Sequence, residues 1–92
     1  MHIQKSLTHL RERLARARGE LRIVEEQILF QMDVLEEAKT RMLVSETPIA
    51  DREFRIARDD YERLVGQRSS VNSEIVDLQR EQDRLLDRML NA

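Results

Sequence analysis

The chain has 92 residues, of which 37% are charged, 40% hydrophobic and only 3% aromatic, and its formal net charge at pH 7 is −2. This composition is typical of coiled coils and long helices, and it excludes a compact core built on large aromatic rings. The lack of cysteine excludes disulfide bonds and thiolate metal ligands. A transmembrane helix is not expected, because the sequence has no apolar run approaching the roughly 18 residues that such a helix needs.

Residues 3–44 carry an apolar seam that predicts the first helix. Steps of four and three residues in alternation, starting at Ile3, reach eleven apolar residues in twelve positions. The seam positions are Ile3, Leu7, Leu10, Leu14, Ala17, Leu21, Val24, Ile28, Gln31, Leu35, Ala38 and Met42. This heptad spacing is typical of a helix that packs along a facing helix.

Residues 45–48 predict a turn of about three to five residues. Pro48 lacks a backbone donor and disfavours helical geometry at Thr47, so a helix running through both residues is not expected. Pro48 suits the first position of a new helix, and Thr47 suits its N-cap.

Residues 48–90 predict the second helix, because the same stepping from Ala50 reaches ten apolar residues in twelve positions when Tyr61 is counted. The seam positions are Ala50, Phe54, Ala57, Tyr61, Leu64, Arg68, Val71, Ile75, Leu78, Gln82, Leu85 and Met89.

The two seams have equal length and can close on each other. In an antiparallel helix pair, the residue numbers of two facing seam residues always add to the same value. With a value of 92, every seam residue of the first helix faces a seam residue of the second, from Met42 with Ala50 to Ile3 with Met89. The sequence therefore predicts an all-α fold: a two-helix antiparallel coiled-coil hairpin forming one domain over residues 1–92.

Polar residues interrupt the seam in three layers. Gln31 faces Tyr61, Arg68 faces Val24, and Gln82 faces Leu10. Such residues commonly fix the register of a coiled coil at some cost in stability, and we predict this role for Gln31, Tyr61, Arg68 and Gln82. An alternative function for Arg68 is to bind an anionic ligand or partner. The plain structural interpretation is that its aliphatic stem lies along the seam while its guanidinium reaches solvent or Glu25.

A second apolar stripe lies outside the seam and predicts a partner-binding surface. Its members are Ile23, Phe30, Val34, Val44, Ile49 and Ile56, with Leu29, Met32 and Leu43 nearby. Because an isolated hairpin buries one stripe per helix, we expect this stripe to pack in a homodimer with a four-helix arrangement. A different protein partner and scattered exposed side chains are the alternatives.

Gly19 and Gly66 fall at outward positions of the two helices. They are either tolerated surface residues or part of a joint where the helices bend or a partner's backbone comes close.

The charges are unevenly distributed. Residues 1–22 carry a formal charge of +4 and residues 23–47 carry −4. The basic segment faces the acids Glu74, Asp77, Glu81, Asp83 and Asp87 in the predicted hairpin. We expect these groups to pair and reinforce the register. The alternative is an electrostatic nucleic-acid-binding protein that uses this arm, including Arg11, Arg16 and Arg18.

No catalytic constellation stands out. His2 and His9 lack a third ligand at a metal-site spacing, and Asp59, Asp60 and Glu62 alternate with arginines on a solvated surface. We expect no enzymatic activity, no cofactor and no metal.

Two resemblances link helical hairpins to transcription. The acids Glu46, Asp51 and Glu53 near the turn resemble those at the tip of transcript-cleavage factors, which insert a coiled coil into RNA polymerase. Residues Tyr61, Arg63 and Gln67 resemble part of the motif of bacterial anti-sigma hairpins that bind a cyclic dinucleotide. Asp60 and Val71 stand at that family's serine and aspartate positions, so the ligand motif is not fulfilled, and the chain is assigned to neither family.

The function expected from the sequence is a non-enzymatic, cytoplasmic protein–protein interaction module. It would self-associate and dock a helical partner as an adaptor or regulator, with a possible association with transcription. We expect a protein partner in preference to nucleic acid, and no insertion into a membrane.

Overall fold

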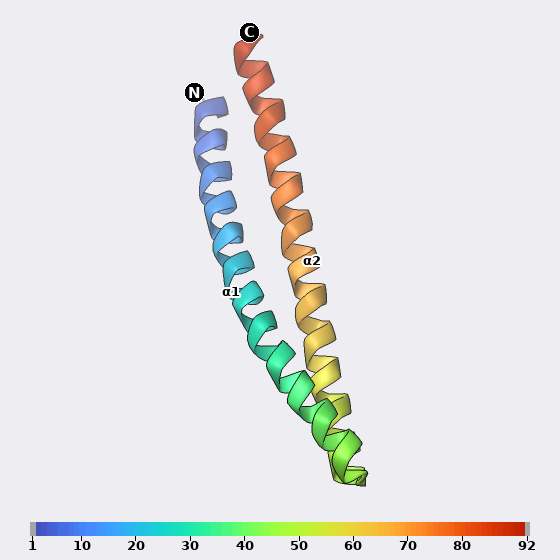
Figure 1. Cartoon of the computed structure of the whole chain (residues 1–92). Helices are drawn as coiled ribbons and strands as arrows, with labels where there is room; N and C mark the ends of the chain where they lie inside the picture. The colour runs from blue at the N-terminus through green and yellow to red at the C-terminus, as the bar shows by residue number, and fades with distance from the viewer. Residues whose placement is uncertain (1, 92) are drawn as a thin grey trace. The chain divides into compact units, whose positions relative to one another are not determined.

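The computed structural model describes residues 2–91 as two α-helices, α1 (His2–Ser45) and α2 (Pro48–Leu90), with no strand in this range. The helices are antiparallel and pack against each other, which confirms the predicted all-α hairpin (Figure 1). Dimerisation stays a prediction.

The packing falls into two compact units. Among the described residues, unit 1 consists of residues 2–22 with residues 69–91, and unit 2 consists of Ile23–Arg68, which contains the turn. Each unit holds one stretch of both helices, so each has its own part of the seam.

The core of unit 1 is rich in leucine. Its buried cluster consists of Leu10, Leu14, Ala17, Leu78 and Leu85, with Ile3, Leu7 and Ile75 packed against it. The cluster, with the residues packed against it, holds both members of three predicted pairs: Leu7–Leu85, Leu14–Leu78 and Ala17–Ile75. It does not include Gln82 and Met89, the predicted partners of Leu10 and Ile3. We attribute its closure to the large, well-fitting side chains that both helices supply.

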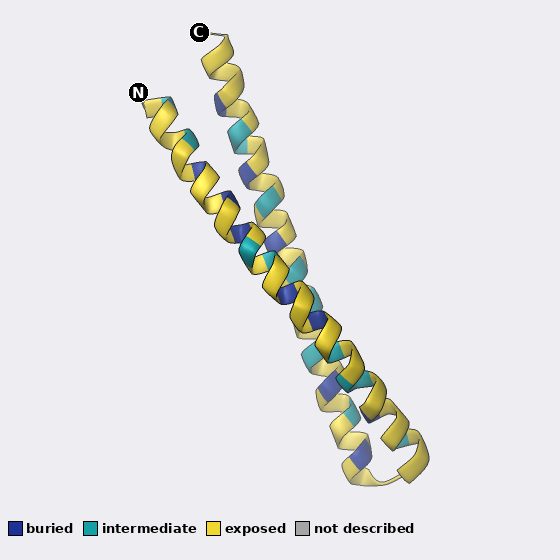
Figure 2. Ribbon diagram, turned by 60° about the vertical axis from the view of Figure 1, so that its left-hand side comes forward, coloured by how far each residue is buried: buried dark blue, intermediate teal, exposed yellow. Residues whose placement is uncertain are grey.

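The core of unit 2 uses smaller residues. Its buried side chains are those of Val24, Ile28, Ala38, Ala50 and Ala57, all at seam positions. The larger seam residues here are only half-buried. Figure 2 shows buried residues recurring along each helix with exposed residues between them, as a single buried stripe per helix requires.

One seam position does not behave as expected. Met89, which the register sets opposite Ile3, remains 45% exposed. It lies in the last turn of α2, where few side chains remain to cover it.

Both glycines have open space where a side chain would stand. A Cβ added at Gly19 or Gly66 would meet no heavy atom within 4 Å outside its own helical turn. Inside the described part of the chain, neither position serves a close approach between helices.

The turn is shorter than the sequence predicted. Ser45 still belongs to α1 and Pro48 is the first residue of α2, which leaves only Glu46 and Thr47 between the helices. Glu46 adopts a left-handed backbone with φ of 51°, and its N–H donates to the Met42 carbonyl at 3.1 Å. A left-handed residue of this kind ends a helix within one residue, and glycine is the usual residue there. The chain can therefore reverse direction without a longer loop.

The start of α2 is capped as the sequence suggested. The Ala50 N–H donates to Thr47 Oγ1 at 3.2 Å, and the Asp51 N–H donates to the Thr47 carbonyl at 3.0 Å. Thr47 is therefore the N-cap and Pro48 the first helical residue.

The strain at Glu46 leads to a prediction about stability. We expect Glu46→Gly to raise the free energy of unfolding by about 0.5–1 kcal/mol, because glycine removes the Cβ conflict of the left-handed conformation. Glu46→Val should lower it. Urea denaturation followed by circular dichroism measures both variants.

The matched control is Glu37→Gly in the exposed interior of α1, which should cost about 1 kcal/mol. If Glu46→Gly destabilises the hairpin as much as this control does, the left-handed turn is not the conformation in solution.

Candidate functional site

The predicted partner-binding residues share one face of unit 2. If the seam occupies heptad positions a and d, Ile23, Phe30, Val44, Ile49 and Ile56 fall at position c and Val34 at position g. Positions c and g are neighbours on a helix, and the g positions of an antiparallel pair approach each other. The six residues therefore form one surface, which we call the apolar face.

An ion pair between the helices marks this face. Arg41 Nε lies 3.4 Å from Glu53 Oε2, and both residues are at position g. Because this pair joins α1 to α2 on the same side as the apolar residues, it supports the assignment of c and g positions to one face.

The side chains of the apolar face are solvent-exposed. Phe30 is 71% exposed, Ile49 is 70% exposed and Val44 is 79% exposed, and Ile23 and Ile56 are also more than half exposed. Val34 is half-buried, since position g lies closer to the seam. Most of the large exposed hydrophobic residues in the described range belong to unit 2.

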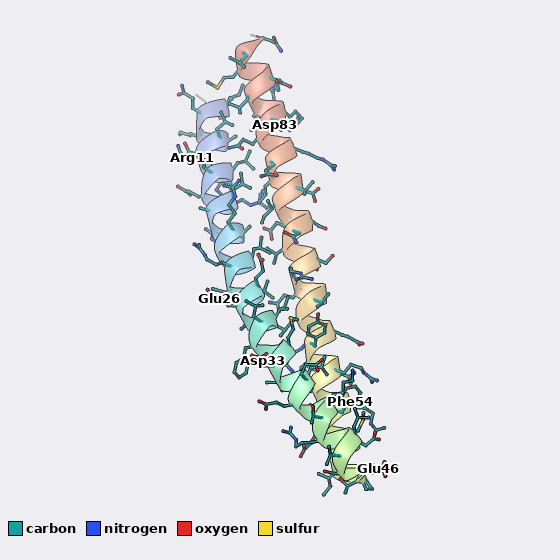
Figure 3. All side chains as sticks on the ribbon, in the orientation of Figure 1. Arg11, Glu26, Asp33, Glu46, Phe54 and Asp83 are labelled. Atoms are coloured by element: carbon teal, nitrogen blue, oxygen red, sulfur yellow. The ribbon has the colours of Figure 1, made fainter. Side chains whose placement is uncertain are left out.

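A shallow groove crosses the face at Phe30. It has a volume of about 430 Å³ and is lined by Ile23, Glu26, Gln27, Phe30, Gln31, Arg63 and Leu64. Arg63 is held by Asp60, whose Oδ1 lies 3.2 Å from Arg63 Nη2. The groove thus combines apolar side chains from both helices with a carboxylate and a guanidinium group. Figure 3 labels Glu26 and Asp33 on α1 in this unit.

The four predicted register-setting residues all lie at the seam and are half-buried. Gln31 Nε2 donates to the Ala57 carbonyl of α2 at 3.1 Å. This carbonyl points towards Tyr61, the residue that the register sets opposite Gln31. The ion pairs of the described residues do not include Arg68, so the predicted alternative contact with Glu25 is not formed.

The acids near the turn do not form an isolated charged tip. Asp51 pairs with Arg55 at 3.4 Å, and Glu53 pairs with Arg41. A small hollow of about 410 Å³ at the turn is lined by Met42, Glu46, Thr47, Pro48 and Asp51. Two of the three predicted tip acids are thus already engaged by arginines of this chain.

Unit 1 has a larger but polar groove. Its volume is about 620 Å³ and its lining consists of Leu10, Arg13, Ser69, Ser70, Ser73, Glu74, Asp77, Leu78 and Glu81. The Arg84 guanidinium donates to both carboxylate oxygens of Glu81, with a 2.9 Å bond from Nε, and this lowers the pKa of Glu81. A carboxyl held in its ionised form by an exposed arginine is unsuited to acid catalysis.

The predicted pairing of the basic arm with the acids of α2 is wrong at the level of direct contacts. Within residues 2–91, the ion pairs are Arg41–Glu53, Arg55–Asp51, Arg58–Asp59, Arg63–Asp60 and Arg84–Glu81. None includes a basic side chain from the N-terminal segment, residues 2–22 of the described chain. Two features of the flanking positions account for this. At positions e, where facing residue numbers have a sum of 90, the neutral Gln79 and Asn72 stand across from Arg11 and Arg18. At positions g, where the sum is 94, Arg13 stands across from Glu81, whose carboxylate is already engaged by Arg84.

The described residues contain no group of three or more His, Cys, Asp or Glu side chains placed to hold a metal ion. Neither helix has a segment apolar and long enough to span a membrane in this range. His2 and His9 are exposed, and Asp59 pairs with its neighbour Arg58 at 3.3 Å.

Comparisons of the chain with protein-family models, with curated proteins and with solved structures found no match. The apolar face is therefore characterised by its own geometry and chemistry.

The Glu81–Arg84 contact leads to a pH prediction. In the intact chain we expect the pKa of the Glu81 carboxyl to lie below that of an ordinary glutamate, because Arg84 stabilises the ionised form. The stabilisation is present above the unfolded-state pKa and is lost as the pH falls through the folded-state pKa. Carbon-detected NMR titration measures this pKa directly.

Arg84→Ala should return the pKa of Glu81 to the ordinary range, and Arg80→Ala on the same helix is the matched control. An unchanged Glu81 pKa in Arg84→Ala would show that the contact does not persist in solution.

Proposed function

We propose that the protein is a non-enzymatic interaction module that self-associates and docks a helical partner, as a cytoplasmic adaptor or regulator. The observation that carries the proposal is the apolar face, where five large side chains stay more than half exposed on one side of unit 2. Exposed apolar side chains gathered on one side in this way favour an interaction site, and charged residues stand between them at the same heptad positions, among them Glu37, Arg41, Glu53 and Arg63. The high charge and the absence of cysteine fit a reducing compartment.

The energy available on this face is of the right size for association. Complete burial of one large apolar side chain contributes about 1.5–3 kcal/mol. Since the five side chains are already partly covered, their burial offers about 5–10 kcal/mol together. The entropic cost of association is about 4–15 kcal/mol, so several of these side chains must be covered at once. A partner that touches Phe30 alone would not bind stably.

The shape of the face favours a helix as the occupant. The stripe follows both helices, and an amphipathic helix can lay apolar residues spaced three and four apart along such a groove. A second hairpin supplies two helices and would complete a four-helix arrangement. Arg63 and Glu26 at the rim would add polar contacts that select the partner's orientation.

The proposal is tested with Phe30→Glu. We expect wild type to self-associate and Phe30→Glu to have a clearly lower average mass at equal concentration, because a carboxylate cannot be buried in an apolar contact without a partner. Sedimentation equilibrium measures the mass, and circular dichroism checks that the variant remains helical.

Leu43→Glu is the matched control. Leu43 is 63% exposed on α1 of the same unit, but it falls at position b, away from the apolar face. If wild type and Phe30→Glu are both folded monomers, or if Leu43→Glu lowers the mass as much as Phe30→Glu, the apolar face is not the contact surface.

The second candidate function is electrostatic binding of nucleic acid by residues 5–22. It is favoured by one observation: Arg11, Arg16 and Arg18 are exposed and form no ion pair with a described residue. On our proposal, fluorescence anisotropy should detect no salt-dependent binding of labelled duplex DNA or RNA. Binding that weakens with salt and disappears when the three arginines become alanine would favour this candidate.

A further inference from the structure

The α1 side of the apolar face carries carboxylates beside its apolar side chains. Glu26 and Asp33 fall at position f, one turn before and one turn after Phe30, and Glu37 falls at position c, two turns after it. All three belong to unit 2 and are exposed, and Glu26 and Asp33 are labelled in Figure 3. Residues three, four and seven apart lie on one side of a helix. The three carboxylates therefore border Phe30, and we call them the acidic edge.

The acidic edge is not neutralised within the hairpin. In the range 2–91, no ion pair includes any of its three carboxylates. Arg41 lies one turn after Glu37, but it pairs with Glu53 of α2. Arg63 lines the same groove as Glu26, but it pairs with Asp60. Acids of α2 thus engage the guanidinium groups that share the face with the acidic edge.

The outer rim of α2 on this side is close to neutral. Its residues at position f in unit 2 are Arg52, Asp59 and Gly66. Asp59 pairs with Arg58, whereas Arg52 is exposed and enters no ion pair with a described residue. Lys39 of α1 falls at position e, on the opposite side. This side of unit 2 therefore keeps an excess of negative charge, and the excess lies along α1.

Repulsion within the acidic edge favours a cationic partner. Asp33 and Glu37 are four residues apart, and like charges at this spacing on a helix destabilise it. A lysine or arginine placed between the two carboxylates relieves their repulsion. A neutral partner gains nothing from this effect.

The groove at Phe30 determines where an apolar group can enter. Its volume is about 430 Å³, and Ile23 and Phe30 of α1 line it together with Leu64 of α2. Glu26 belongs to the same lining. A partner helix that places an aliphatic side chain in this groove therefore brings its flanking residues alongside the acidic edge.

We propose that the helical partner of the apolar face is a basic amphipathic helix. Its apolar side chains enter the groove at Phe30, and its lysines or arginines lie along the acidic edge. The inference rests on the docking part of the proposed function and names the chemistry of the partner. Because both occupants cover the same apolar side chains, the basic helix competes with a second copy of the chain.

Charge distinguishes the basic helix from the other possible occupants. A second copy buries the same apolar side chains, but it brings its own acidic edge to the contact and doubles the excess of carboxylates. An acidic helix or a nucleic acid is repelled by the same groups, since like charges in an interface disfavour binding. The basic helix combines apolar burial with neutralisation of the acidic edge.

The test uses two synthetic peptides of about 20 residues, long enough to form a helix. Both carry leucine at a spacing of three and four residues. The flanking positions hold lysine in the basic peptide and glutamate in the acidic peptide. Fluorescence anisotropy of the labelled peptides measures their binding to the 92-residue chain at low salt. We expect the basic peptide to bind, and the acidic peptide to bind at least about tenfold more weakly.

Neutralisation of the acidic edge tests its contribution. The triple variant Glu26→Gln, Asp33→Asn and Glu37→Gln should bind the basic peptide about tenfold more weakly than wild type does, since each exposed ion pair contributes a small factor. High salt should reduce this difference. Phe30→Ala should also weaken binding, because the groove loses an apolar wall.

The matched control neutralises three acids on the opposite side of the same unit. Glu25→Gln, Glu36→Gln and Glu62→Gln change positions e and b and alter the net charge by the same amount. This control variant should bind the basic peptide as wild type does. Circular dichroism checks that every variant remains helical.

The proposal is overturned if the basic peptide does not bind, or if the control variant loses as much affinity as the acidic-edge variant. Unchanged binding in Phe30→Ala would also overturn it. Equal binding of the two peptides would show that the acidic edge does not select the partner. Tighter binding of the acidic peptide would identify Arg52 and Arg63 as the selecting groups and contradict the proposal.

The proposed function is judged separately by sedimentation equilibrium. The acidic-edge variant keeps every residue of the apolar face, so it should self-associate at least as strongly as wild type. Self-association without selective binding of the basic peptide would refute the inference alone. A monomeric wild type that binds the basic peptide selectively would refute self-association and leave the inference standing.

Discussion

The closure of two apolar seams determines which surfaces the hairpin can offer. Once seam residues must face each other with a constant sum of residue numbers, the remaining positions of each helix are divided between two sides. In unit 2, positions c and g gather Phe30 and its neighbours on one side of the helix pair, and positions b and e lie on the other side. Neither surface was selected by local sequence alone, because both depend on which residues the seam occupies.

The two units use the same seam geometry with different side chains, and this difference explains where apolar surface remains. In unit 1, leucines from both helices fill the seam and form the buried cluster. In unit 2, three of the five buried members are alanines, Ala38, Ala50 and Ala57, which lie beside the buried Val24 and Ile28. Phe54 and Tyr61 at the same seam are only half-buried. Small seam residues bury less apolar area and therefore contribute less stability to the unit. Unit 2 thus has most to gain from a partner that covers its exposed side chains.

Most of the fold could be predicted from the sequence because coiled-coil packing depends on spacing and Pro48 interrupts it visibly. The left-handed conformation of Glu46 could not be, since glutamate gives no signal for it and glycine is the usual residue there. The pairing of the basic arm was predicted wrongly because net charge was compared by segment, whereas contact depends on the residues that face each other. Heptad positions set the neutral Gln79 and Asn72 across from Arg11 and Arg18, and the acid across from Arg13, Glu81, is bound by Arg84 of its own helix. Heptad positions would also have placed the six apolar residues on a single face.

If the apolar face binds a partner as proposed, that contact depends on burial of hydrocarbon, and salt screening does not weaken it. The ion pairs on the same face, Arg41–Glu53 and Arg63–Asp60, are exposed, and screening weakens them once the Debye length falls to a few ångströms. High salt would therefore loosen the polar contacts that orient a partner and leave the apolar contact in place. Because these residues lie outside the seam, such a change needs no rearrangement of the hairpin core.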